Sequence, residues 1–290
     1  MKCSICPREC GADRKEKKGF CGVGEEFTLA RAAKHMWEEP PISGSRGSGT
    51  VFFSGCNLGC VFCQNYEISH NCRGKTVTPE RLREICDRLI GEGVHNINLV
   101  NPTHYASALS DFLDKNSFSV PVVYNSGGYE KAETLKLLEG KIQIYLPDLK
   151  YISSDRSGKY SAAPDYFTYA SEALTEMKRQ CPENIYDEEG IMQRGLIVRH
   201  LILPKNTNQS LKILDWIAEN LGTDTVISLM SQYTPYGRVD SFPELQRKIT
   251  EREYLKVISY AQELGFESIF TQSPLSADEQ YIPAFDFTGI

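Results

Sequence analysis

The sequence lacks the features that would place the protein at a membrane or on nucleic acid. It has no apolar stretch approaching the roughly 20 residues that a membrane-spanning helix needs. Its start, MKCSICPREC, contains no apolar segment of the signal-peptide kind. It has no long basic run, and its net charge is −6. Neither nucleic acid nor an anionic membrane is therefore expected as its principal partner.

Internal repeats and low-complexity segments are also missing, so the chain is expected to fold as ordinary globular structure. A hydrophobic content of 41% and an aromatic content of 10% are sufficient for a core. The length of 290 residues suits one large α/β domain, either alone or with an appendage.

Cysteine, by contrast, is abundant. Without a secretory signal, the ten cysteines indicate a reducing, cytoplasmic environment and metal binding rather than disulfides. Seven of them fall into two tight clusters, and Cys72, Cys86 and Cys181 are scattered. Cys86 lies among apolar residues at helical spacing, so we expect it in the core. Cys72 could be an extra cluster ligand, but its spacing matches no iron–sulfur run.

The central cluster lies in the segment SGCNLGCVFCQNY. Its cysteines, Cys56, Cys60 and Cys63, follow the spacing C-x3-C-x2-C, and the residue before the last one is the aromatic Phe62. Cubane iron–sulfur clusters are normally held by four thiolates. Three thiolates can hold three irons and leave the fourth iron open to another ligand, as a catalytic site requires.

The N-terminal cluster comprises Cys3, Cys6, Cys10 and Cys21. Four thiolates without histidine suit either a closed zinc site or a second, fully ligated iron–sulfur cluster. A bound metal would help so short a segment to fold. The alternative is four unrelated thiols in a flexible tail.

Strand-like and helix-like segments alternate from residue 50 onward, which predicts parallel β/α units. We expect strands at 50–54, 97–100, 120–124, 142–146, 195–203 and 226–230, with short strands at 28–33 and near 268–271. We expect helices at 79–90, 105–113, 131–138, 165–179, 210–220 and 251–264, and a loop at 151–164.

Six β/α units are too few to close an eight-stranded barrel, so the fold class is expected to be an open (β/α)6 partial barrel with a small Cys-rich N-terminal extension. Residues 1–46 would form the extension and connector, 47–236 the barrel, and 237–290 a C-terminal helix and strand that complete it. Chemistry is expected at the carboxyl ends of the strands.

Polar residues cluster at those strand ends. They are Asn101, Thr103, His104, Asn125, Ser126, Asp148, Lys150, Arg199, His200 and Gln232. Asp148 and Lys150 are two apart, so their side chains should face the same side, whereas at most one of Arg199 and His200 can point inward. The two histidines could equally be satisfied core residues, and Asn125 and Ser126 could be turn formers.

The connector WEEPPISGSRGSG precedes the first barrel strand. Its Trp37 and the acid pair Glu38–Glu39 could approach the site, but we expect a packed aromatic ring and a solvated acid pair.

The triad with its aromatic residue resembles the signature of the radical S-adenosylmethionine (SAM) enzymes. The segments CPRECG, NPTHY, YNSGGYE, LPDLKY, KYSAAPDY, GLIVRHLILP, SLMSQYTP and FDFTG extend the resemblance to nearly the whole chain. Together they resemble the pyruvate formate-lyase activating enzyme-like proteins of the PflX type. Two departures are the four-cysteine extension and NPTHY in place of the usual Gly-Gly-Glu turn after the second strand.

The resemblance implies a [4Fe–4S] cluster on Cys56, Cys60 and Cys63, with SAM on the fourth iron. Reductive cleavage of SAM would yield methionine and a 5′-deoxyadenosyl radical that abstracts hydrogen, under anaerobic conditions. Carboxylate, amine, ribose and adenine groups of SAM suit the polar strand ends. The expected SAM-binding residues are Phe62, Asn101, Thr103, His104, Asn125, Ser126, Asp148, Lys150, Arg199 and Gln232.

The leading hypothesis is therefore a radical SAM enzyme, with activation of a glycyl radical enzyme as one specialisation and a flavodoxin or ferredoxin as electron donor. Modification of a small molecule or peptide is the alternative. A different class, a non-catalytic iron–sulfur protein for electron transfer or redox sensing, is disfavoured because the triad has no clear fourth cysteine.

Overall fold

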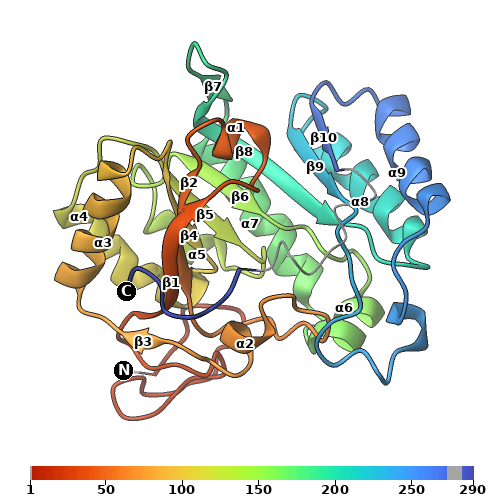
Figure 1. The fold of residues 1–290 in the computed structure, drawn as a ribbon. Coiled ribbons are helices and arrows are strands. Elements are labelled where there is room, and N and C mark those ends of the chain that lie inside the picture. Colours follow the sequence, from red (N-terminus) through yellow and green to blue (C-terminus); the bar gives the residue numbers. More distant parts are fainter. Residues whose placement is uncertain (1, 273–282) are drawn as a thin grey trace.

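Parallel strands form the centre of the fold in the computed structural model, which describes residues 2–272 and 283–290 (Figure 1). They are β2 (Ser48–Phe53), β4 (Ile97–Val100), β5 (Val122–Ser126), β6 (Ile144–Pro147), β8 (Met192–Leu201), β9 (Val226–Met230) and β10 (Ile269–Thr271). Each pairs in parallel with the next along this series. All six predicted barrel strands are therefore present, and β10 extends them.

The sheet does not close on itself within the described residues. Its order is β10-β9-β8-β6-β5-β4-β2-β1-β3, and β7 (Ile185–Tyr186) pairs with β8 off this path. The end beyond β2 is antiparallel, because β1 (Thr28–His35) runs against β2 and β3 (Lys75–Thr76) against β1. The predicted open partial barrel is confirmed.

Amphipathic helices surround the sheet, with α3 and α4 on one side in Figure 1 and α8 and α9 on the other. Their bounds are α3 Pro79–Gly91, α4 Ala106–Lys115, α5 Ala132–Lys136, α7 Tyr166–Gln180, α8 Thr207–Asn220 and α9 Glu251–Glu263. Local signals begin two of them: Thr78 accepts a hydrogen bond from the Arg81 amide at 3.2 Å, and Thr250 and Glu253 form a capping box.

Several short elements were not predicted. They are α1 (Pro40–Ser43), α2 (Tyr66–Ser69), α6 (Ser154–Ser161), β3, β7 and the 3-10 turns η1 (Thr103–Tyr105) and η2 (Pro243–Leu245). The expectation of a loop at 151–164 was wrong over α6, whose sequence SDRSGKYS has few strong helix formers. Burial of Tyr160 and Ser161, both at most 1% exposed, stabilises this helix through tertiary packing.

Apolar side chains fill both faces of the sheet. The larger core lies between the sheet and the helices, and a smaller one contains Val123, Ile144, Leu146 and Ile197 from neighbouring strands. Ile42 of α1 is fully buried in this smaller core, so α1 anchors the connector against the sheet.

The N-terminal segment folds back on itself and lies beside α2 and β3 in Figure 1. The Cys3 amide donates to the Ala12 carbonyl at 3.0 Å, and the Gly19 amide donates to the Val23 carbonyl at 3.1 Å. The division at residues 46 and 236 stays a prediction, and residues 273–282 of the last part lie outside the described residues. None of the described helices is long and apolar enough to cross a membrane.

Candidate active site

The loop that carries Cys56, Cys60 and Cys63 follows β2 directly and ends at α2. Its backbone needs glycine at its start, because Gly55 has φ +85° and a Cβ there would lie 2.5 Å from the Cys21 carbonyl oxygen. Only glycine combines this conformation with so close an approach. The loop is thus held against the N-terminal segment where it leaves the strand.

Each sulfur of the triad accepts a hydrogen bond from a nearby group. The Leu58 amide donates to Cys56 Sγ at 3.3 Å, the Ser161 hydroxyl to Cys60 Sγ at 3.1 Å, and the Ser69 hydroxyl to Cys63 Sγ at 3.2 Å. The sequence carried no signal for either serine: Ser161 lies 101 residues from Cys60. The thiolate ligands of a metal cluster commonly accept hydrogen bonds at their sulfur atoms.

Burial disfavours free thiolates in this loop. It raises the pKa of Cys60, and it raises the pKa of Cys63 to about 12, with the neighbouring cysteines adding to the effect. The thiolates therefore need a bound metal to form. Within residues 2–272 and 283–290, no three His, Cys, Asp or Glu side chains are placed to hold a single metal ion. A cubane offers a separate iron to each thiolate, and three thiolates leave its fourth iron open to another ligand.

A cavity of about 370 Å³ opens beside the triad at the carboxyl ends of the strands. Of the predicted SAM-binding residues, those that line it are Phe62, Asn101, Asn125, Ser126, Asp148, Lys150, Arg199 and Gln232. Cys56, Cys60 and Cys63 line the same cavity. The structure therefore brings the cysteine loop and five strand ends to one space.

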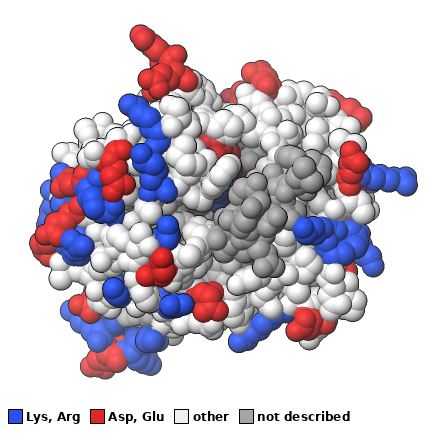
Figure 2. All heavy atoms as spheres, in the orientation of Figure 1, with Lys and Arg blue, Asp and Glu red and all other residues white. Residues whose placement is uncertain are grey.

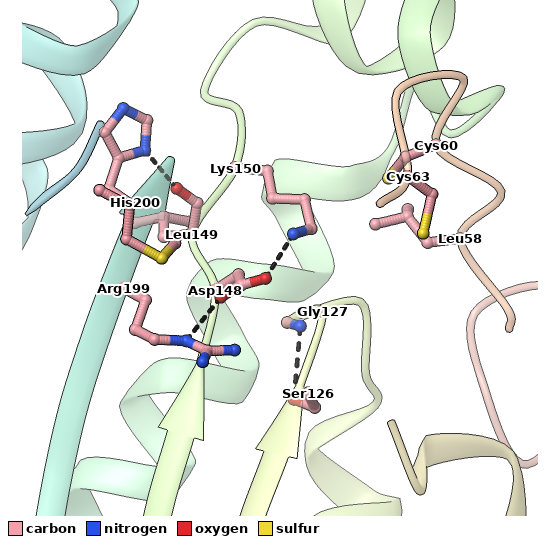
Figure 3. Close-up of polar contacts among 12 residues, drawn as sticks. Leu58, Cys60, Cys63, Ser126, Gly127, Asp148, Leu149, Lys150, Arg199 and His200 are labelled. Atoms are coloured by element: carbon pink, nitrogen blue, oxygen red, sulfur yellow. Dashed lines mark hydrogen bonds and ion pairs between the residues drawn. The ribbon is translucent and has the colours of Figure 1, made fainter. Parts of the chain in front are cut away.

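Charged groups are paired at the centre of this cavity (Figure 3). Asp148 lies between Lys150, which contacts one carboxylate oxygen, and Arg199, whose Nε donates to the other at 2.9 Å. Burial alone would raise the pKa of Asp148, but Arg199 and Lys150 lower it. Burial would likewise lower the pKa of Lys150, but Asp148 and the Cys60 thiol raise it. The pair predicted to face one side does so, and both groups stay charged.

The expectation for the connector was wrong on all three residues. Trp37 is 66% exposed, whereas Glu39 is only 8% exposed and the Glu38 side chain, paired with Arg199, is only 10% exposed. Glu38 accepts hydrogen bonds from Asn98 Nδ2 at 3.1 Å and Arg199 Nη1 at 3.3 Å. Because α1 is anchored by Ile42, the two residues before it enter the cavity rather than the solvent.

Burial raises the pKa of Glu38 and of Glu39 above their usual values, although Arg199 opposes the shift in both cases. Glu39 Oε2 is buried and has no hydrogen-bond partner in the described part of the chain. Both side chains line the cavity.

Thr103 and His104 do not line the cavity. Thr103 donates to Glu130 at 3.0 Å, and Tyr124 donates to the same carboxylate at 2.8 Å. The His104 ring is 1% exposed and its Nε2 donates to the Ser54 carbonyl at 2.8 Å. Thr103 and His104 therefore stabilise the strand ends from outside the cavity.

His200 behaves as the alternation of strand residues predicts. It points away from Asp148 in Figure 3, and its Nδ1 lies 2.7 Å from the Leu149 carbonyl oxygen. Arg199 is the member of that pair that faces the cavity.

The four N-terminal cysteines lie together beside the triad loop. A Cβ on Gly19 would lie 3.4 Å from the sulfurs of both Cys10 and Cys21. Cys72 Sγ lies 3.6 Å from the Cys21 carbonyl oxygen, which also accepts the Cys56 amide at 3.2 Å. The two cysteine clusters are therefore neighbours in space.

Comparison with known proteins agrees with this site. Residues 50–144 match the family described as the Radical SAM superfamily. The uncharacterized protein MJ0674 of Methanocaldococcus jannaschii is 31% identical over 281 residues, which cover 92% of this chain and 76% of that protein. A second uncharacterized protein of that organism, MJ0808, is 23% identical over 310 residues, covering 94% of this chain and 85% of its own.

Among solved structures, SuiB of Streptococcus suis shares the fold, with a TM-score of 0.52 and 14% identity over 76% of this chain. The chain spans about half of that protein, 47% of its length. With the family match and the relative at 31% identity, the fold and the cysteine loop define an iron–sulfur enzyme of the SAM-cleaving kind. The chain belongs to the radical SAM superfamily, whose members use a [4Fe–4S] cluster and SAM.

Proposed function

We propose that the protein holds a [4Fe–4S] cluster on Cys56, Cys60 and Cys63 and cleaves SAM reductively to abstract hydrogen from a substrate. The observation that carries this proposal is the shared cavity: the triad lines it together with charged and polar side chains from five strand ends. When bound, the cluster supplies the electron that splits SAM into methionine and a 5′-deoxyadenosyl radical. The protein contributes binding, orientation and exclusion of water.

The side chains around Asp148 suit the amino-acid end of SAM. Lys150 and Arg199 are cations for its carboxylate, and Asp148 and the Asn101 side-chain oxygen are acceptors for its amine. Lys150 lies near enough to the Cys60 thiol for each to influence the pKa of the other. We infer that Lys150 anchors SAM beside the cluster loop.

The apolar part of SAM would lie against the wall formed by Phe62. Its ring packs edge-on against Tyr151, Tyr160 and Tyr233, with ring centroids 5.9 to 6.5 Å apart, which fixes its orientation. Asn125, Ser126 and Gln232 offer hydrogen-bonding groups for the ribose and the adenine edge. Glu39 leaves one buried oxygen for a donor on a bound molecule.

Anaerobic reconstitution tests the proposal. The protein is treated with iron and sulfide, then given SAM and dithionite, and 5′-deoxyadenosine is measured. We expect product from the wild type, none from Cys60→Ala, and near wild-type product from Cys86→Ala, a matched control in the core of α3. A wild type with full cluster content and no 5′-deoxyadenosine would leave only a non-catalytic iron–sulfur role.

The substrate is a finer proposal, which rests on the sequence resemblance: activation of a glycyl radical enzyme, with a flavodoxin or ferredoxin as electron donor. A glycine-centred electron spin resonance signal in a co-incubated partner tests it. If 5′-deoxyadenosine forms and no glycyl radical appears, the alternative is hydrogen abstraction from a small molecule or peptide.

We also propose a second metal site, held by Cys3, Cys6, Cys10 and Cys21. The proposed location of the protein is cytoplasmic. Metal analysis of a variant without Cys56, Cys60 and Cys63 distinguishes zinc, iron or no metal at the N-terminal cysteines.

A further inference from the structure

Arg8 connects the N-terminal cysteine segment to the triad loop. It lies between Cys6 and Cys10, and its guanidinium donates four hydrogen bonds to backbone carbonyls far away in the chain. The acceptors are Asn57 at 2.8 Å, Leu58 at 2.8 Å, Ser161 at 2.9 Å and Ala162 at 2.5 Å. One side chain thus joins the triad loop to the end of α6.

Two aromatic rings orient this guanidinium. It lies 4.2 Å from the ring centre of Phe20, which is N-terminal, and 5.2 Å from that of Tyr129, which follows β5. The Tyr129 carbonyl in turn accepts a hydrogen bond from Asn57 Nδ2 at 2.6 Å. A planar guanidinium that contacts two aromatic rings has its orientation restricted, so its donors point in fixed directions.

Backbone contacts continue the same interface. The Cys21 carbonyl accepts the Cys56 amide at 3.2 Å, and it lies where a Cβ on Gly55 would clash. The N-terminal segment therefore contacts four consecutive residues of the loop, from Gly55 to Leu58. A flexible tail would not make contacts with so many consecutive residues of the loop.

The contact also reaches the second cysteine of the triad. Ser161 accepts from Arg8 through its carbonyl and donates to Cys60 Sγ through its hydroxyl. Displacing Arg8 would therefore disturb the donor to Cys60 as well as the backbone between Cys56 and Cys60.

We propose that the N-terminal four-cysteine segment holds the triad loop in its conformation, a role we call a brace, and that Arg8 is the positioning residue through which the segment acts. The proposal rests on the proposed function, because it gives the loop the role of cluster holder. Arg8 also places a positive charge beside the loop, and net charge near a cluster sets its reduction potential. Without that charge, adding an electron becomes less favourable.

Two substitutions separate these effects. Arg8→Gln removes both the positive charge and the planar set of guanidinium N–H donors, whereas Arg8→Lys keeps the charge and loses the planar set of donors. Arg81→Gln is the matched control, because Arg81 is an exposed arginine of α3 paired with Glu84. Thermal unfolding of each variant verifies that it folds.

The first measurement uses the cluster-free protein. Hydrogen exchange is followed at the amides of Leu58, Val61 and Cys63, which donate to Cys56 Sγ, to the Tyr160 carbonyl and to the Cys60 carbonyl. We expect exchange about tenfold faster in both Arg8 variants and unchanged exchange in Arg81→Gln. Unchanged exchange in folded Arg8→Gln would overturn the brace.

The second measurement uses the reconstituted protein. We expect Arg8→Gln to lower the midpoint potential of the cluster, Arg8→Lys to stay nearer to the wild type, and both to lose about 10- to 100-fold in 5′-deoxyadenosine formation. Wild-type potential and activity in Arg8→Gln would contradict the positioning role. If the wild type itself binds no cluster, the proposed function fails, while the exchange measurement still tests the brace.

Discussion

Arg199 and Asp148 are joined across the ends of two neighbouring strands: Arg199 Nε on β8 donates to Asp148 Oδ1, just after β6, at 2.9 Å. Both side chains are only 13% exposed. Arg199 also contacts Glu38 at 3.3 Å and donates to Asn125 at 2.6 Å. One guanidinium therefore holds two buried acids and a third strand end around the cavity.

Arg199→Gln should destabilise the fold strongly. It leaves Glu38 with no cation and Asp148 with Lys150 alone, and breaking a buried ion pair typically costs about 3–5 kcal/mol. Urea unfolding at neutral pH measures the loss. Adding Glu38→Gln should recover part of it, because the buried carboxyl that has lost its cation is then removed. As a control, Arg81→Gln on the exposed surface of α3, where Arg81 pairs with Glu84, should change the free energy of unfolding by less than about 1 kcal/mol. Equal stabilities of Arg199→Gln and wild type would contradict this account of the cavity.

Charge on the face shown in Figure 2 has no comparable organisation. On the face in Figure 2, acidic and basic side chains are interspersed around the rim, and neither sign forms a continuous field.

The barrel could be predicted because its signals are local. Each parallel strand is a short apolar run that ends in a polar turn, and caps such as Thr78 mark where helices begin. Periodicity alone also predicted that Asp148 and Lys150 share a side and that Arg199 and His200 do not. These relationships depend only on neighbours in the chain.

The predictions that were wrong concern residues whose positions depend on contacts between distant segments of the chain. Glu38 and Glu39 look solvated in sequence, but they line the cavity, next to a helix, α1, whose Ile42 is anchored in the smaller core. His104 was expected at SAM, yet the 3-10 turn η1 directs it to the carbonyl of Ser54. Nothing local distinguishes a polar residue that lines a cavity from one that supports the cavity wall.

Ser161→Ala should lower the reduction potential of the reconstituted cluster. Its hydroxyl donates to Cys60 Sγ at 3.1 Å, and a donor to sulfur stabilises the more negative, reduced cluster. One hydrogen bond contributes about 1 kcal/mol, so the shift should be up to about 40 mV for a one-electron couple. Potentiometric titration followed by electron spin resonance measures it. Ser157→Ala on the same helix is the matched control, because that hydroxyl bonds within the helix at 3.2 Å. Identical potentials in the two variants would show that the bond to Cys60 has no such effect.

His104 should make the fold less stable in mild acid. Burial lowers the pKa of this histidine to about 3, whereas an unfolded histidine titrates near 6.5. As the pH falls below about 6.5, the unfolded chain therefore takes up a proton that the folded chain does not, and stability is lost at up to about 1.4 kcal/mol per pH unit. His104→Gln keeps a donor for the Ser54 carbonyl but cannot titrate. Urea unfolding between pH 6.5 and 5 should thus show the wild type losing about 2 kcal/mol more than the variant. Other buried titrating groups, such as His200 and Glu130, are common to both proteins and cancel in this difference. Parallel stability curves for the two proteins would mean that His104 is protonated in the folded state.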